Sequence, residues 1–211
     1  GVNTCVMEVT SHACMQKRIE GVRFKGGIFT NLSHEHLDYH TTMEEYAKAK
    51  KRFFDQLSKE KEGFAVVNKD DQWHSYMVQG FAHPVISYSM EDPSADFFAH
   101  SVSFNNERMI CTIEAFHTSY RLETPLIGRF NVMNILAAVA SAHAIGIPIE
   151  KGVHALSSFL GAPGRMERVP NELGITAVVD FAHKEAALRH ALRTLREVTS
   201  GSIITVFGCG G

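Results

Sequence analysis

Hydrophobic and polar positions follow two different periods along this chain, which predicts strands and helices in succession. Short apolar runs typical of strands alternate with segments in which apolar residues recur every three or four positions. The expected strands are residues 4–9, 27–31, 64–68, 85–88, 97–104, 109–115 and 120–123, and the clearest helices are residues 43–57, 131–145 and 185–198. This succession predicts an α/β fold with a mostly parallel sheet flanked by helices.

Two regions modify that picture. The three expected strands between residues 97 and 123 lie close together and alternate in polarity, so we expect them to form an antiparallel portion. Small residues at positions 161–165 suggest a hinge, after which strand 175–181, helix 185–198 and strand 202–207 predict a new βαβ unit. We therefore expect one domain over residues 1–168 and the beginning of a second over residues 169–211.

Composition and charge exclude several classes of protein. The formal charge is −2, so no basic surplus indicates nucleic acid or an anionic membrane surface as a partner. The four cysteines, Cys5, Cys14, Cys111 and Cys209, form no CxxC pair, which favours a reducing compartment and predicts a cytoplasmic protein. No leader pattern or long apolar run predicts export or a membrane span. Both ends interrupt expected elements, so we expect a piece of a longer protein.

Glu8 ends an otherwise apolar expected strand, and two hydroxyl residues, Thr10 and Ser11, follow it. Ligands of open α/β sheets bind beyond the carboxyl ends of strands, so Glu8 is placed to hold a cation or a substrate. The alternative is an acid that faces water or pairs with Lys17. Thr10 and Ser11 are more often helix caps than ligands.

The segment 30–40 follows the next expected strand and reads TNLSHEHLDYH. It concentrates more polar and ionisable side chains than a turn requires. The spacing of His34, His36 and His40 permits a zinc site, but no cysteine lies nearby and the oxygen groups equally suit magnesium. A polar loop that caps the helix beginning near Thr42 remains the alternative.

Lys50 interrupts the apolar face of helix 43–57. Its helical period places it beside Met43, Tyr46, Ala47, Phe54 and Leu57, whereas Lys48, Lys51 and Arg52 point elsewhere. An inward lysine is unfavourable unless it pairs, extends its amine to solvent or is chemically altered. Extension to solvent is the ordinary explanation.

Further polar residues accompany the second half of the chain. Asn131 and Asn134 open the alanine-rich helix 131–145 and could contact a nucleobase, although capping is the default for Asn131. Arg165 and Asp180 flank the expected hinge and the strand after it. Each of these two alone would be an ordinary surface charge.

Taken together, several of these segments resemble the Mur ligases, most closely the branch that acts on UDP-MurNAc-L-Ala-D-Glu. The segments that carry the resemblance are residues 7–13 (MEVTSHA), 30–33 (TNLS), 36–40 (HLDYH), 42–46 (TMEEY) with Ala49 and Lys50, 164–168 (GRMER) and 206–211 (VFGCGG). Each segment is modest by itself, but their order and spacing cover the whole chain.

The resemblance implies an ATP- and Mg²⁺-dependent ligase of peptidoglycan synthesis. ATP would phosphorylate a substrate carboxylate, and an amine would attack the acyl phosphate to form an amide. Diaminopimelate or L-lysine would supply the amine, and the enzyme would be a monomer. The resemblance also implies a central ATP-binding domain, without its phosphate-loop segment, at residues 1–168 and a Rossmann-like C-terminal domain that begins at residue 169.

Roles for individual residues follow from the same resemblance. Glu8, His36 and Lys50 would form the metal site, with Lys50 carbamylated and, together with His36, catalytic. The muramoyl dipeptide would bind at Thr10, Gln16 and Arg18, where Arg18 suits an acidic substrate. ATP would contact Asn134 near adenine, Arg165 near phosphate and Asp180 near the ribose.

The chain also departs from the family pattern. His34 and Glu35 replace an Arg-Asp pair, and residues 181–185 (FAHKE) replace a Tyr-Ala-His-Thr-Pro run. No Gly-rich phosphate loop with its lysine precedes Glu8 within these 211 residues, so we expect this piece alone to be inactive. The alternatives are a related folylpolyglutamate or cyanophycin synthetase and a non-catalytic nucleotide- or metal-binding remnant.

Overall fold

The computed structural model of this chain describes residues 3–33, 40–104, 108–183 and 185–208. Two compact units divide the chain, residues 1–97 and residues 98–211. The elements up to this boundary are α1 (Ser11–Met15), β1 (Gly27–Phe29), α3 (Met43–Leu57), β2 (Ala65–Asn68), α4 (His74–Met77) and β3 (Val85–Ser89). From the boundary onward they are β4 (Phe97–Phe104), β5 (Met109–Ala115), β6 (Thr118–Thr124), α5 (Arg129–Ala144), α6 (Ile149–Leu156), β7 (Glu167–Val169), β8 (Ala177–Val179) and α7 (Glu185–Val198).

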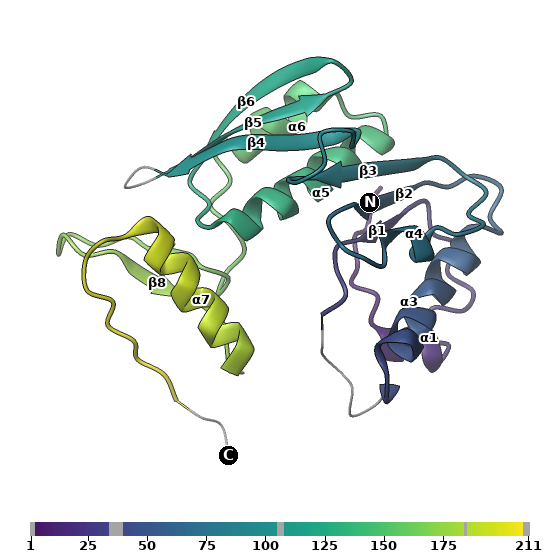
Figure 1. Ribbon diagram of the computed structural model, residues 1–211, viewed down its shortest axis with the longest axis horizontal. Coiled ribbons are helices and arrows are strands. Elements are labelled where there is room, and N and C mark those ends of the chain that lie inside the picture. The colour runs from purple at the N-terminus through teal and green to yellow at the C-terminus, as the bar shows by residue number, and fades with distance from the viewer. Residues whose placement is uncertain (1–2, 34–39, 105–107, 184, 209–211) are drawn as a thin grey trace. The chain divides into compact units, whose positions relative to one another are not determined.

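The strand order confirms the predicted α/β class with a parallel and an antiparallel portion (Figure 1). Strands β1 to β6 follow one another in one six-stranded sheet, and β7 and β8 form a separate two-stranded sheet. The pairs β1–β2 and β2–β3 are parallel, and β5–β6 is antiparallel. In the part of the chain that the structure describes, no helix is long and apolar enough to cross a membrane.

In the first unit, the central strand β2 is buried along its whole length. Its four residues, Ala65 to Asn68, pair with β1 on one side and β3 on the other. A strand buried on both faces is expected to show a continuous apolar run, as this one does until Asn68. The side chain of Asn68 ends the run by donating a hydrogen bond to the Thr30 carbonyl (2.7 Å). The strand ends of β1 and β2 are therefore joined by a side chain.

Helix α3 has the bounds that its apolar period predicts. Thr42 is the N-cap, where its hydroxyl accepts a hydrogen bond from the backbone N–H of Glu45 (3.2 Å). Glu44 and Glu45 lie in the first turn, where negative charge is favourable. The buried face consists of Tyr46, Ala47, Ala49, Phe53, Phe54 and Leu57. This face packs against α1, α4 and β1 (Figure 1).

In the second unit, β5 and β6 form the expected antiparallel pair, with Ile113 opposite Tyr120. The residues of β5 alternate strictly between buried and half-buried, which is the two-residue period of a strand covered on one face. Helices α5 and α6 pack against each other, and α6 contacts β6 (Figure 1). Helix α5 begins at Arg129, two residues earlier than predicted.

Two predicted strands are wrong. Residues 4–9 and 202–207 adopt no strand, and neither segment pairs with a described strand. Val6 is exposed in the first segment, and Ile204 and Val206 are exposed in the second. A strand requires a hydrogen-bonded neighbour, so an apolar run without one does not become a strand.

The expected βαβ unit is also corrected. Strand 175–181 is reduced to β8, and its partner is β7, which the sequence did not predict. The two strands are antiparallel, with Arg168 opposite Val178. Helix α7 follows with the predicted bounds. The parallel arrangement was therefore wrong because the neighbour of β8 precedes it and no strand forms after α7 among the described residues.

Candidate functional site

The residues expected to bind substrate gather around the short helix α1. Thr10 is its N-cap, and the Thr10 hydroxyl accepts a hydrogen bond from the backbone N–H of Ala13 (3.1 Å). Gln16 is its C-cap, and Arg18 follows two residues later with an exposed side chain. The capping role expected for Thr10 is confirmed, while the exposed side chains of Gln16 and Arg18 remain accessible to a ligand.

Glu8 precedes this helix and is exposed. It does not pair with Lys17, since the Lys17 ammonium lies 3.3 Å from the Glu20 carboxylate instead. Its charge does reach Lys50, where it favours the charged form of the amine. Glu8 and Lys50 therefore interact electrostatically.

Helix α1 is held against α3, the helix that carries Lys50. Cys14 of α1 is buried in the same hydrophobic core as Tyr46 and Phe53 of α3. After α1, the side chain of Gln56 donates hydrogen bonds to the carbonyls of Ile19 (3.2 Å) and Val22 (3.0 Å). These contacts fix the turn that carries the expected substrate residues relative to α3.

Lys50 lies half-buried on the inner side of α3, as the helical period predicts. Burial lowers the pKa of its amine, and the nearby Cys14 and Glu8 oppose this effect. Its Nζ lies 5.8 Å from the centre of the Tyr46 ring. Lys51 points toward another neighbour, since its Nζ donates to the carbonyl of Gln79 (3.0 Å). Lys50 is therefore the lysine of this helix that faces α1.

A buried polar contact joins α1 to the segment just before α3. Nε2 of His40 is 2.7 Å from Oγ of Ser11, and the two residues are 4% and 1% exposed. The His40 ring also stacks on Tyr46, with ring centres 5.0 Å apart and planes inclined by 11°. Because Nε2 of His40 is hydrogen-bonded to Ser11, this nitrogen is not available as the zinc ligand that the sequence permitted. His34, Glu35 and His36 lie outside the described residues.

Two polar residues that were not predicted from the sequence hold the segment 30–33. The carboxylate of Asp71 accepts a hydrogen bond from the backbone N–H of Leu32 (2.8 Å), and Asn68 binds the Thr30 carbonyl. Asn68 is the last residue of β2, and Asp71 follows three residues later, beyond its carboxyl end. The rule that singled out Glu8 would have found them, because ligands and loops of parallel sheets gather at that edge.

In the second unit, Arg165 and Asp180 come together. Asp180 accepts hydrogen bonds from the backbone N–H groups of Met166 (2.9 Å) and Ala182 (2.8 Å). The Arg165 guanidinium lies 5.2 Å from the centre of the Phe181 ring, next to Asp180 in sequence. The Asp180 carboxylate and the Arg165 guanidinium thus lie where residues 165–166 meet residues 180–181, and the Arg165 side chain is exposed.

Asn134 is exposed on α5, and its amide donates to the side-chain oxygen of Asn131 (3.1 Å). Asn131 donates in turn to the Ile127 carbonyl (2.7 Å). The expected capping role of Asn131 is wrong, because Gly128 is the N-cap and Asn131 lies inside the helix. The amide of Asn134 is nevertheless held in one orientation by its neighbour.

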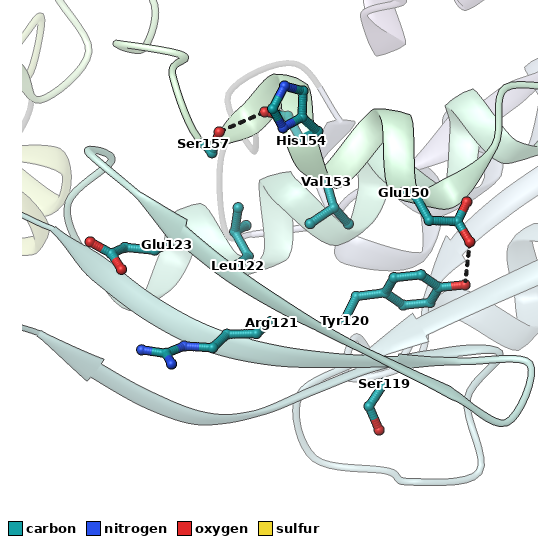
Figure 2. A pocket seen from close by; sticks show the side chains of 9 residues that line it. All are labelled: Ser119, Tyr120, Arg121, Leu122, Glu123, Glu150, Val153, His154 and Ser157. Atoms are coloured by element: carbon teal, nitrogen blue, oxygen red, sulfur yellow. Dashed lines mark hydrogen bonds between the residues drawn. The ribbon is translucent and has the colours of Figure 1, made fainter.

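A hollow of about 620 Å³ lies between β6 and α6, away from every residue predicted from the sequence. Figure 2 shows the Tyr120 hydroxyl directed toward the Glu150 carboxylate, 3.4 Å away, across this hollow. Charges of both signs line it, including Arg121 and Glu123. Nothing about these side chains selects one class of ligand.

Among the described residues, no group of three or more His, Cys, Asp and Glu side chains could hold a metal ion. Of the three residues expected to form the metal site, the structure describes two: the exposed carboxylate of Glu8 and the half-buried amine of Lys50. The fold agrees with two family models: residues 1–142 match the Mur ligase middle domain and residues 164–211 match the Mur ligase, glutamate ligase domain. The chain belongs to the Mur ligase family.

Individual relatives show which Mur ligases this chain is similar to. The chain is 41% identical over its whole length to UDP-N-acetylmuramoyl-L-alanyl-D-glutamate–2,6-diaminopimelate ligase of Geobacter metallireducens, of which it covers 42%. A solved structure of a ligase with the same name is 33% identical, with a TM-score of 0.80, covering 96% of this chain and 42% of that one. The MurF ligase of Thermotoga maritima, solved with ADP, shares the fold at 17% identity and a TM-score of 0.74, covering 90% and 42%. The chain thus spans less than half the length of these relatives.

Proposed function

We propose that these residues form the middle of an ATP-dependent ligase that adds diaminopimelate to UDP-MurNAc-L-Ala-D-Glu in peptidoglycan synthesis. The names of the relatives at 40% identity and above support this substrate and this amine. The observation that carries the proposal is the half-buried amine of Lys50 on the inner side of α3, where the charge of Glu8 still acts on it. L-Lysine is the alternative amine. The proposed enzyme acts as a monomer in the cytoplasm.

The chemistry around Lys50 fits a divalent cation held by oxygen atoms. An ammonium cannot bind a cation, but a neutral lysine amine adds to CO₂, forms a carbamate and releases one proton. Burial lowers the pKa of Lys50 and so raises the fraction of neutral amine that can react. The carbamate of Lys50 and the carboxylate of Glu8 would then hold Mg²⁺ together with His36, which lies outside the described residues. The bound cation would offset the negative charge of the phosphates.

The residues around α1 would orient the acidic muramoyl dipeptide. Arg18 offers its exposed guanidinium to a carboxylate of the muramoyl dipeptide, and Thr10 and Gln16 offer polar groups at the two ends of α1. The substrate carboxylate would attack the γ-phosphorus of ATP and release ADP. The incoming amine would then attack the acyl carbon, lose a proton and displace phosphate.

The proposed nucleotide contacts are Asn134, Arg165 and Asp180. Asp180 accepts two backbone hydrogen bonds, and its carboxylate oxygens keep lone pairs for ribose hydroxyls. Arg165 is exposed and suits a phosphate. The Thermotoga maritima relative was solved with ADP, which supports a nucleotide as the second ligand.

The decisive experiment supplies the intact protein with ATP, Mg²⁺, UDP-MurNAc-L-Ala-D-Glu and diaminopimelate. We expect ADP, phosphate and the UDP-MurNAc-tripeptide in equal amounts, measured by liquid chromatography and mass spectrometry. L-Lysine in place of diaminopimelate tests the alternative amine. Turnover of folates would instead indicate a folylpolyglutamate synthetase, and nucleotide binding without any turnover would indicate a non-catalytic remnant.

A further inference from the structure

Ser11 and His40 form a buried polar pair that the proposed chemistry does not use. They are 29 residues apart in sequence, are almost fully buried and approach to 2.7 Å. Ser11 lies three residues after Glu8, in the first turn of α1. His40 lies two residues before Thr42, the N-cap of α3. The pair therefore joins the segment of Glu8 to the beginning of the helix that carries Lys50.

A buried polar pair requires a reason, because apolar side chains of similar size would fill the same space with less desolvation. Such a pair is favourable only when both groups are hydrogen-bonded, and it then accepts a single arrangement. Helix α1 has five residues, too few to fix its own conformation. Its position therefore depends on contacts such as the one between Ser11 and His40.

The ring of His40 also contacts Tyr46, which in turn lies near Lys50. The His40 ring stacks on Tyr46 at 5.0 Å with nearly parallel planes. Tyr46 lies one helical turn before Lys50, and the Lys50 amine is 5.8 Å from the centre of the Tyr46 ring. Hydrogen bonding on one side and stacking on the other leave His40 little freedom. A continuous set of contacts thus leads from Ser11 through His40 and Tyr46 to Lys50.

We propose that His40 and Ser11 are positioning residues that hold the carboxylate of Glu8 and the side chain of Lys50 at the separation required by one divalent cation. This inference rests on the proposed function, because that function supplies the cation. The pair does not contact the cation and acts through the two segments it joins. Residues that orient metal ligands in this indirect way commonly change metal affinity by about 10- to 100-fold when they are replaced.

The test measures binding of Mn²⁺ alone to the intact protein in bicarbonate buffer, by electron paramagnetic resonance. Ser11→Ala and His40→Leu should each weaken Mn²⁺ binding by about tenfold. The double variant should bind no more weakly than the weaker single variant, because both changes break the same contact. His40→Gln retains a hydrogen-bonding group and should restore part of the affinity.

Ser89→Ala is the matched control. Ser89 is also a buried serine, 0% exposed, and its hydroxyl donates to Asp70 at the end of β3. The Ser89 hydroxyl also accepts hydrogen bonds from the backbone N–H groups of Glu91 (2.9 Å) and Asp92 (2.7 Å), so Ser89→Ala should lose at least as much thermal stability as Ser11→Ala. Only Ser11→Ala should lose Mn²⁺ affinity. This comparison separates positioning from a general effect on folding.

Two outcomes distinguish this inference from the proposed function. Wild-type Mn²⁺ affinity in both Ser11→Ala and His40→Leu would overturn the positioning role even if the intact protein makes the tripeptide. Selective loss of Mn²⁺ affinity in these variants would support the positioning role even if no tripeptide forms, and the absence of tripeptide would then count against the proposed function alone.

Discussion

At the scale of single residues, the cost of burying a charge determines what Lys50 can do. Its ammonium is partly withdrawn from water, and the structure offers it the diffuse attraction of Glu8 and the face of Tyr46. The neighbouring Lys51 shows the ordinary solution, since its amine donates to a carbonyl and also pairs with Asp55. A half-buried lysine whose amine faces an aromatic ring is a candidate for chemical modification.

We predict that Lys50 carries CO₂ in the intact protein. After equilibration with ¹³C-labelled bicarbonate, ¹³C NMR should show a carbamate resonance that disappears in Lys50→Gln. Lys48→Gln is the control, because Lys48 is an exposed lysine of the same helix and its replacement should leave the resonance unchanged. Acidification should remove the resonance, since a carbamate is labile in acid. A resonance that survives in Lys50→Gln would contradict this assignment.

At the scale of elements, helix termini depend on residues that the apolar period does not show. Helix α5 begins after Gly128, which has a φ of +89° and approaches α7 closely. A Cβ at this position would lie 2.3 Å from Cγ2 of Thr194, a buried β-branched side chain with little room to move. Gly128 therefore meets a conformational and a steric requirement together.

We predict that Gly128→Ala destabilises the protein more than Gly146→Ala does. Gly146 has the same φ of +89° but no atom within 4 Å of an added Cβ, so its replacement tests conformation alone. Gly146→Ala should cost about 1 kcal/mol and Gly128→Ala about 3 kcal/mol, because overpacking adds to the backbone strain. Urea unfolding followed by circular dichroism measures both. Equal losses would show that the contact with Thr194 relaxes without cost.

At the scale of the whole molecule, the relatives are much longer than this chain. This chain covers 42% of the Geobacter metallireducens ligase. Phosphoryl transfer relies on several positioned groups around the nucleotide, and a Gly-rich loop with its lysine is a common one. Residues 1–7 contain no such loop before Glu8.

We predict that the 211-residue polypeptide alone releases no phosphate from ATP, whereas the intact protein does so in the presence of the muramoyl dipeptide and diaminopimelate. A continuous phosphate assay with both proteins at the same concentration provides the comparison. The polypeptide should first be shown to be folded by circular dichroism. ATP-dependent phosphate release by the polypeptide above the rate of a buffer blank would contradict this prediction.

The sequence predicted the elements whose signals are local. Helices α3 and α7 have the bounds that periodicity gave, and β4 and β5 were also found in full. For the site, periodicity placed Lys50 inward. The strand expected to end at Glu8 does not form, although the charge of Glu8 still acts on Lys50. The resemblance added roles for Thr10, Gln16, Arg18, Asn134, Arg165 and Asp180, and these roles remain predictions.

Only the tertiary structure decided which segments meet. It left residues 4–9 and 202–207 without strand partners, gave β8 an antiparallel neighbour in β7, and brought Ser11 to His40. The reason is physical. A helix satisfies its hydrogen bonds within a few residues, so its period reveals it, whereas strand pairing and buried polar contacts join distant residues whose encounter no local pattern encodes.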